Sequence, residues 1–404
     1  MKTSLLAFGA AAACGALLVS PAMAQKKYGP GASDTEIVLG QTMAYSGPAS
    51  AYGTIGKAEA AYFDMINAQG GVNGRKIKFL TLDDGYSPPK TVEQTRRLIE
   101  QDNILADFSS LGTPTDTAIH KYLNQKKVPH IFIASGATKW GDPQNFPWSM
   151  GWQPTYQTEG HIYAKYILQH MPNAKIGILY QDDDYGKDYV KGMVDGLGGK
   201  AKTMIVKQVS YETTDPSVES QIISLQASGA NVFFNVTTPK FAAQAIRKAH
   251  DIGWHPTHFL NSVSNSVGAV LKPAGLDASK GLLTVEYLKD PTDPAFKNDK
   301  GNKQWLAWMD KYYPSGDKKD IFNVFGYSEA ETMVQVLKQC GDNLTRENVM
   351  KQAANLHLSL PMLLPGITIN TSATDWYPIK EEQLAKFDGT TWVRFGGVIK
   401  VASK

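Results

Sequence analysis

The sequence predicts an α/β protein built from two lobes, each a parallel sheet flanked by helices. Apolar strand patterns alternate with helical patterns from residue 36 to residue 134, and a second series of the same kind begins at residue 175. Length supports the division, because the roughly 380 residues after residue 24 exceed the roughly 250–300 that one hydrophobic core usually serves.

The first lobe begins with a strand, a helix, a strand and a helix. Residues 37–43 form an apolar run that predicts a buried strand, and Ser-Gly-Pro at 46–48 ends it before a helix that stops at Gly70. The later elements are expected as strands at 76–83, 104–108 and 130–134, and a helix at about 90–101. Ligands bind beyond the carboxyl ends of strands in such sheets, so the loops after these strands are candidate binding loops.

The second lobe is expected to contain strands at 175–180, 204–209 and 232–236. One helix between them has clear signals, with Asp215 as its N-cap, Pro216 at its first position and Gly229 at its end. Residues 147–160 are rich in aromatic residues and turn formers and have no clear period. This segment predicts a crossover between the lobes.

Residues 1–24 predict a secretory signal peptide. Lys2 precedes an apolar segment at residues 5–19, and Ala22-Met23-Ala24 is a typical cleavage motif. The apolar segment is shorter than the roughly 20 residues that a membrane-spanning helix needs. We therefore expect cleavage after Ala24 and a soluble protein in the periplasm.

Composition argues against several classes of protein. The chain has 41 Lys and Arg and 38 Asp and Glu, so removal of Lys2 leaves a formal charge of +2, without the concentrated basic charge that nucleic-acid binding needs. Only Cys340 remains after residue 24, so no internal disulfide is expected. Metalloprotease, serine-hydrolase and phosphate-loop motifs are absent from the sequence, which indicates a protein that is not an enzyme. Consecutive acids at 182–184 lack the spacing of a metal loop, so neither metal nor cofactor is expected.

Several motifs occur in the order and spacing of one known family. They are Ser-Gly-Pro at 46–48, INAQGGVNG at 66–74, the pair Asp83-Asp84, SGAT at 135–138 and DDDYGKD at 182–188. On these residues the chain resembles the leucine/isoleucine/valine-binding proteins, the type I periplasmic binding proteins of ABC importers, over essentially its whole length after residue 24. The two positions that a known member bridges by a disulfide correspond here to Tyr86 and Gly112.

The resemblance implies a particular organisation and set of partners. It implies two Rossmann-like lobes joined by a hinge of three crossovers, with residues 34–153 and 288–364 in the N-terminal lobe and residues 154–287 and 365–404 in the C-terminal lobe. It also implies a monomer that closes on a small ligand and delivers it to a membrane permease.

Two strand ends of the first lobe carry hydrogen-bond donors. At the first, Thr113 reads as an N-cap with Asp116 three residues later, which favours a capping box, while the helix start with Thr113 and Thr115 would also suit a ligand carboxylate. The second is the turn after residue 134, where the resemblance implies ligand contacts from Ser135, Ala137 and Thr138. An ordinary glycine turn is the alternative for this segment.

The second lobe shows a departure from the family. Tyr185 matches an aromatic ligand contact, and Asn235, Thr237 and Ser262 are the other expected contacts, but the segment that should carry an acid for the ligand ammonium, residues 260–265, has none. A buried ammonium without a carboxylate partner is costly, so the ligand is expected to lack an α-amino group. Glu286 and Asp184 remain as alternative sources of negative charge.

Aromatic residues near the expected cleft favour a flat carboxylated ligand, although each of them alone is more often packing than contact. They are Tyr52, Trp152, Tyr156, Tyr185 and Phe322. The predicted function is therefore capture of a small organic acid, preferably an aromatic acid, for an ABC permease. A periplasmic sensor or co-receptor of the same fold, and a binder of branched-chain amino acids or amides, are the alternatives.

Overall fold

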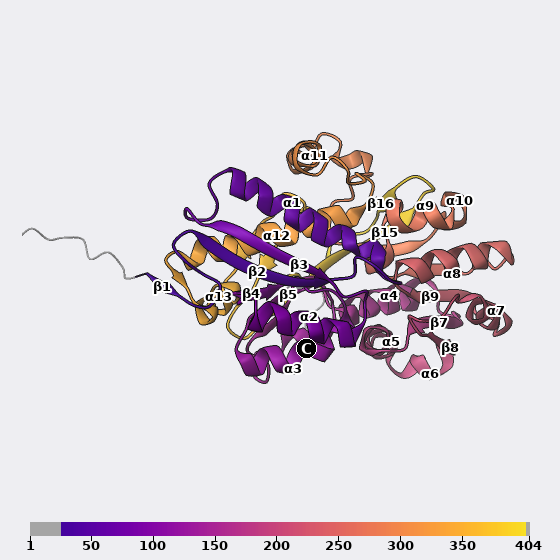
Figure 1. The fold of residues 1–404 in the computed structure, drawn as a ribbon. Coiled ribbons are helices and arrows are strands. Elements are labelled where there is room, and N and C mark those ends of the chain that lie inside the picture. Colours follow the sequence, from indigo (N-terminus) through magenta and orange to yellow (C-terminus); the bar gives the residue numbers. More distant parts are fainter. Residues whose placement is uncertain (1–25, 401–404) are drawn as a thin grey trace, which may run out of the picture.

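The computed structural model describes residues 26–400. They form two lobes side by side, with the chain passing between them more than once (Figure 1). The expected signal peptide, residues 1–24, lies outside the described residues. Among residues 26–400, no helix is long and apolar enough to cross a membrane.

The first lobe contains a five-stranded parallel sheet in the order β3-β2-β4-β5-β6. Its strands are β2 (Glu36–Met43), β3 (Lys76–Asp83), β4 (Ala106–Phe108), β5 (His130–Ile133) and β6 (Ser149–Gly151). Its helices are α1 (Gly53–Ala68), α2 (Pro88–Glu100), α3 (Thr113–Lys126), α11 (Lys300–Tyr312), α12 (Ile321–Cys340) and α13 (Arg346–Ala353). Two small pairings complete it, β1 (Lys27–Tyr28) with β12 (Asn343–Leu344), and β13 (His357–Leu358) with β14 (Ile369–Asn370).

The second lobe contains a sheet in the order β16-β15-β11-β10-β9-β7-β8, with β17 paired to β15. Its strands are β7 (Ile176–Gln181), β8 (Ile205–Tyr211), β9 (Val232–Val236), β10 (Thr257–Leu260), β11 (Leu283–Glu286), β15 (Glu381–Phe387), β16 (Trp392–Arg394) and β17 (Ile399–Lys400). Its helices are α4 (Tyr156–His170), α5 (Asp184–Leu197), α6 (Ala201–Met204), α7 (Glu219–Ala227), α8 (Pro239–Asp251), α9 (Lys272–Ala274) and α10 (Leu276–Ser279). Strands β15 to β17 are antiparallel to their neighbours, whereas β7 to β11 are parallel.

Short turns of helix lie at several loops. They are η1 (Ser50–Tyr52), η2 (Thr138–Gly141), η3 (Gly198–Lys200), η4 (Ser262–Ser264), the π-turn η5 (Val267–Leu271) and η6 (Pro294–Phe296). Of these, η1, η2 and η4 follow the carboxyl ends of parallel strands, the edge at which ligands bind in such sheets.

Two expectations about the elements are wrong. Helix α7 begins at Glu219, because the Asp215 carboxylate accepts a hydrogen bond from the Glu212 amide at 3.0 Å and closes a turn instead of capping the helix. The last crossover lies near residue 380 and not at 364/365. Ile369, Trp376 and Ile379 still pack into the core of the first lobe, and the chain enters the second sheet only at β15.

A pair of buried glutamates joins α1 to α12 inside the first lobe. Glu59 and Glu329 are fully buried; Gln41 donates to Glu59, and the Ser109 hydroxyl donates to Glu329 at 2.7 Å. Burial raises the pKa of Glu59 to about 8, and burial together with the neighbouring Glu59 raises the pKa of Glu329 well above its usual range. The folded protein therefore keeps these carboxyls protonated where an unfolded chain would ionise them.

This pair predicts how stability depends on pH. The contribution of Glu59 is fully present below its ordinary pKa of 4.5 and is lost as pH rises toward about 8, because the folded state holds the proton more tightly. Glu59→Gln cannot ionise, so its free energy of unfolding relative to wild type should improve between pH 5 and pH 8, by roughly 1–3 kcal/mol. Urea unfolding at both pH values measures this difference. Glu93→Gln, a substitution at an exposed glutamate, should show the same change in the free energy of unfolding between pH 5 and pH 8 as wild type. If Glu59→Gln also showed the same change as wild type, Glu59 would not be protonated in the folded protein.

Candidate ligand-binding site

A cavity of about 70 Å³ lies between the lobes, at the carboxyl ends of strands from both sheets. A single buried water needs roughly 10–15 Å³, so the space suits a small molecule. Its aromatic wall consists of Tyr52, Tyr86, Tyr156, Tyr185, Tyr287, Phe322 and Phe325. Its polar lining consists of Thr113, Gln153, Thr238, Ser262, Asn265 and Glu286. No Lys, Arg or His of the described chain is part of the lining.

The start of α3 forms one wall of the cavity. Gly112 lets the backbone at the helix start lie close to the Tyr86 ring. Gly112 has φ of 110°, and a Cβ atom there would lie 2.5 Å from the Tyr86 ring and 2.6 Å from the Thr115 hydroxyl. The hydroxyls of Thr113 and Ser135 lie 2.7 Å apart, and Trp140 Nε1 donates to Ser135 at 2.9 Å. Thr113 lines the cavity, whereas Ser135 does not line it and orients the Thr113 hydroxyl by a hydrogen bond.

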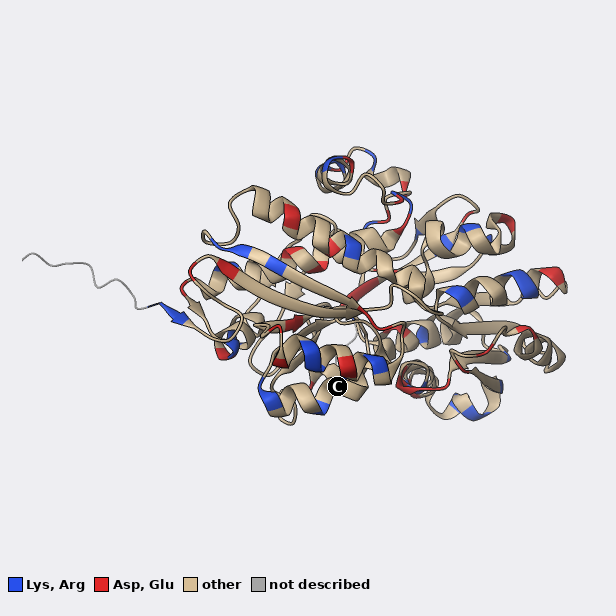
Figure 2. Ribbon diagram, viewed as in Figure 1, with Lys and Arg blue, Asp and Glu red and all other residues tan. Residues whose placement is uncertain are grey.

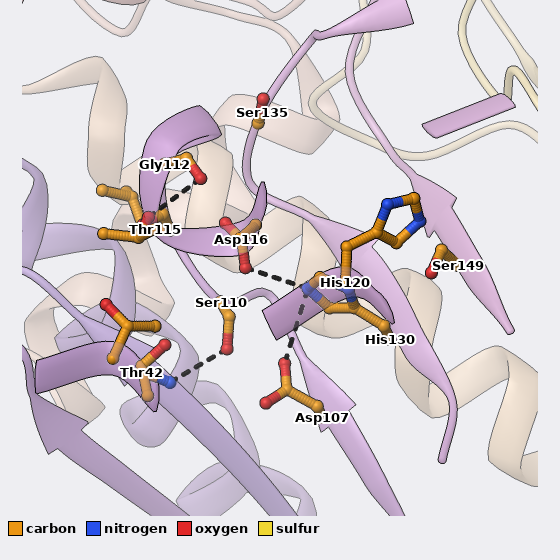
Figure 3. A network of polar contacts seen from close by, with 12 residues as sticks. Thr42, Asp107, Ser110, Gly112, Thr115, Asp116, His120, His130, Ser135 and Ser149 are labelled. Carbon is orange, nitrogen blue, oxygen red and sulfur yellow. Dashed lines mark hydrogen bonds and ion pairs between the residues drawn. The ribbon is translucent and has the colours of Figure 1, made fainter. Parts of the chain in front are cut away.

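The expected capping box does not form. Thr113 is the first helical residue, Gly112 precedes it, and no side chain caps the helix. Thr115 turns back to donate to the carbonyl oxygen of Gly112 at 2.9 Å and also to that of Leu111, so it does not line the cavity (Figure 3).

Asp116 takes part in a buried network behind the helix start (Figure 3). Its Oδ1 lies 2.9 Å from His130 Nε2, and Asp107 lies 4.0 Å from the same nitrogen. Burial raises the pKa of Asp116 well above its usual range and lowers the pKa of His130 to about 4, so the pair carries no net charge. The positive end of α3 is therefore not neutralised by an ionised Asp116.

His120, on the same helix, is also buried. Its ring stacks on Phe146 at 4.0 Å between centroids and meets the edge of Trp140 at 5.0 Å. Helix α3 places this side chain against the segment 140–146 and not toward solvent. Burial lowers the pKa of His120 to about 3.

The structure places Thr138 outside the cavity, at a contact between the lobes. Its amide and its hydroxyl both donate to Asp188 Oδ2 of α5, at 2.8 and 2.9 Å. Ala137 packs among apolar residues of the second lobe. Tyr52 donates to the Val263 carbonyl at 2.9 Å, and Ser266 donates to Asp320 at 2.8 Å. These contacts join the two lobes directly, so the structure is of a closed form.

The second lobe contributes Tyr185, Ser262 and Thr238 to the cavity. Tyr156 at the start of α4 lies 5.3 Å from Tyr185 between ring centroids, and the two rings form a corner. Ser262 donates through its amide and hydroxyl to Glu159, at 2.8 and 2.6 Å, which orients its loop.

Asn235 and Thr237 are fully buried and are not part of the cavity lining. The Thr237 hydroxyl donates to the Asn235 side-chain oxygen at 2.7 Å, and Thr238 lines the cavity instead. The expected aromatic Trp152 is likewise inside the first lobe, where its Nε1 donates to Thr332 at 3.0 Å. Phe322 does reach the cavity.

Several lining residues were not expected as contacts. Tyr86 follows the Asp83-Asp84 strand end, a signal that could have been used, whereas Gln153, Asn265 and Tyr287 have no local signal. Glu286 was considered only as an alternative source of charge and is part of the lining.

The acidic triplet does not converge on one point. Asp183 caps α5 by accepting from the Tyr185 amide at 2.9 Å, while Asp182 pairs with Lys187 at 2.9 Å and Asp184 with Lys139 at 2.7 Å. Within residues 26–400, no group of three His, Cys, Asp or Glu is placed to hold a metal ion.

Charges of both signs are scattered over the helices of both lobes (Figure 2).

Comparison with known proteins agrees with this architecture. A family model described as periplasmic binding protein matches residues 36–380. The chain belongs to the periplasmic binding protein family. Its fold is the type I periplasmic binding fold, and the family consists of binding proteins and not of catalysts.

Individual relatives are distant in sequence and close in fold. The Leu/Ile/Val-binding protein homolog 1 of Brucella abortus is 24% identical over 331 residues, which cover 78% of this chain and 82% of the relative. A branched-chain amino acid ABC transporter protein of Thermus thermophilus with bound valine has a TM-score of 0.81 at 16% identity, covering 91% of this chain and 97% of that one. A solute-binding protein of an ABC transporter from R. palustris in complex with benzoate has a TM-score of 0.76 at 18% identity, covering 91% and 98%.

The Thr138–Asp188 contact predicts an indirect effect on binding. Thr138→Val removes the hydroxyl hydrogen bond to Asp188 that joins the two lobes. Because ligand binding between the lobes depends on their being held together, this variant should weaken ligand affinity about threefold to tenfold. Calorimetric titration of any bound ligand measures this loss. Asp184→Asn is the matched control, because its pair with Lys139 is exposed and worth little. An unchanged affinity in Thr138→Val would contradict a role for this contact in closure.

Proposed function

We propose that this protein is the periplasmic solute-binding component of an ABC importer, and that it captures a small carboxylate, with aromatic acids favoured over amino acids. The carrying observation is a small aromatic cavity between two lobes that holds hydrogen-bond donors and the start of α3 but no cationic side chain. The export signal expected at residues 1–24 and the family membership support the location and the partner, a membrane permease.

Anion binding follows from the first lobe. The start of α3 lies at the cavity, because Gly112 and Thr113 both line it, and the first turn of a helix has amides without partners inside the helix. The protein would hold a carboxylate there by neutral donors and the helix dipole, without an ion pair.

The proposed preference for a flat ligand follows from the aromatic side chains that line the cavity. Tyr52 and Phe322 lie 5.0 Å apart between centroids, and Tyr156 and Tyr185 close the other side of the cavity. Such a wall suits a benzoate, phenylacetate or cinnamate type of acid. The relatives with benzoate and with valine represent the two ligand classes to be separated.

A binding panel tests the proposal. Protein beginning at Gln25 is unfolded, freed of ligand and refolded, and its thermal shift and calorimetric titration are measured with benzoate, phenylacetate, cinnamate, leucine and valine. We expect micromolar binding to at least one aromatic acid. Micromolar binding to leucine or valine, with none to aromatic acids, would overturn the proposed ligand class.

A matched pair of variants tests the position of the carboxylate. Thr113→Val should weaken binding of the best acid by the roughly 1.5–3 kcal/mol expected for a lost hydrogen bond to a charged group. Thr117 lies one turn later on the same helix and is exposed. The control variant Thr117→Val should therefore bind the acid as wild type does. Equal affinities in the two variants would remove Thr113 from the site.

A further inference from the structure

Glu286 is an acidic residue in the wall of a cavity proposed to bind an anion. It is the last residue of β11 and lies at the point where the chain leaves the second sheet for the first lobe. Its relative exposure is 5%, and on the neighbouring strand it is paired with uncharged Gln383. A carboxyl group at this position needs a physical explanation, because an isolated buried charge is costly.

No described residue satisfies this carboxyl group. Glu286 Oε2 is buried and has no hydrogen-bond partner among residues 26–400. The nearby cations are already used: Arg394 pairs with Asp293 at 3.1 Å and lies over the Phe296 ring, and Lys289 pairs with Asp299 at 2.8 Å. Glu286 therefore has no ion-pair partner among residues 26–400.

The electrostatic surroundings favour the neutral form. Asp290 and Asp293 raise the pKa of Glu286, and Arg394 lowers it. Among the described residues, the other titratable groups that line the cavity are tyrosines. Burial, reinforced by Asp290, raises the pKa of Glu286 well above its usual range. A ligand carboxylate in the same cavity would raise it further by repulsion.

We propose that Glu286 is protonated and donates a hydrogen bond through its carboxyl O–H to an oxygen of the bound ligand. This inference rests on the function proposed above, and it names the ligand class more closely: a carboxylate without a positively charged group, with an oxygen acceptor within reach of Glu286. An ionised Glu286 would instead select a ligand ammonium. The protonation state of one side chain thus separates organic acids from amino acids at this site.

Two substitutions separate these possibilities. Gln keeps the size and the neutral donor, so Glu286→Gln should weaken binding of the best aromatic acid only about threefold, whereas Glu286→Leu leaves a ligand acceptor unpaired and should weaken it about tenfold or more. A loss in Glu286→Gln as large as in Glu286→Leu would overturn the proposal, as would unchanged binding in Glu286→Leu. Glu381→Gln is the control, because Glu381 lies on β15 outside the cavity and pairs with Lys400 at 3.1 Å.

A measurement without ligand keeps this inference separate from the proposed function. The infrared difference spectrum between ligand-free wild type and Glu286→Gln at pH 7 should contain the carbonyl band of one protonated carboxylic acid, because other protonated carboxyls such as Glu59 and Glu329 are present in both proteins and cancel. The difference spectrum between wild type and Glu381→Gln should not contain this band. If the band is absent from the difference between wild type and Glu286→Gln, the proposal for Glu286 fails even if aromatic acids bind. If no carboxylate binds to wild type, the proposed function fails whatever the spectrum shows.

Discussion

The cavity between the lobes has no cationic side chain among the residues of its described lining, and the small carboxylate that we propose as ligand would have to be held there without an ion pair. The cavity lining of the described chain has no Lys, Arg or His, so the available positive potential comes from the start of α3 and from neutral donors. Gly112 lets the helix start approach the cavity, and the neutral Asp116–His130 pair leaves its positive end uncompensated. In our proposal, Glu286 lies in the same wall in its uncharged form.

Contacts between the two lobes also contribute to the free energy of ligand binding. Tyr52, Thr138 and Ser266 make hydrogen bonds across the lobes in the closed form, and none of these bonds requires the ligand as an intermediary. The closed form is thus stabilised partly by the protein itself. Ligand affinity then depends on the difference between the closed and open states as well as on direct contacts.

Local patterns predicted several strands with the correct bounds. The predicted strands at 76–83 and 232–236 coincide with β3 and β9. They failed at α7 because a competing local turn, closed by Asp215 and Glu212, precedes the helix. They failed at residues 365–379 because distant partners decide the outcome there, where Trp376 and Ile379 pack into the core of the first lobe. The antiparallel strand β15 pairs with β11, and the short strands β16 and β17 pair with β15, so the C-terminal segment completes a sheet whose other strands come much earlier in the chain.

The sequence by itself determined the two-lobed α/β class, the family, and the loops at the carboxyl ends of strands, because periodicity and turn residues are local properties. Of the expected contacts, Tyr52, Thr113, Tyr156, Tyr185 and Ser262 line the cavity. Only the tertiary structure decided that Thr138 joins the lobes, that Asn235 and Thr237 are buried outside the cavity lining, and that Glu286 is part of that lining. Side-chain direction at a strand end depends on which neighbours bury it, and those neighbours come from both lobes.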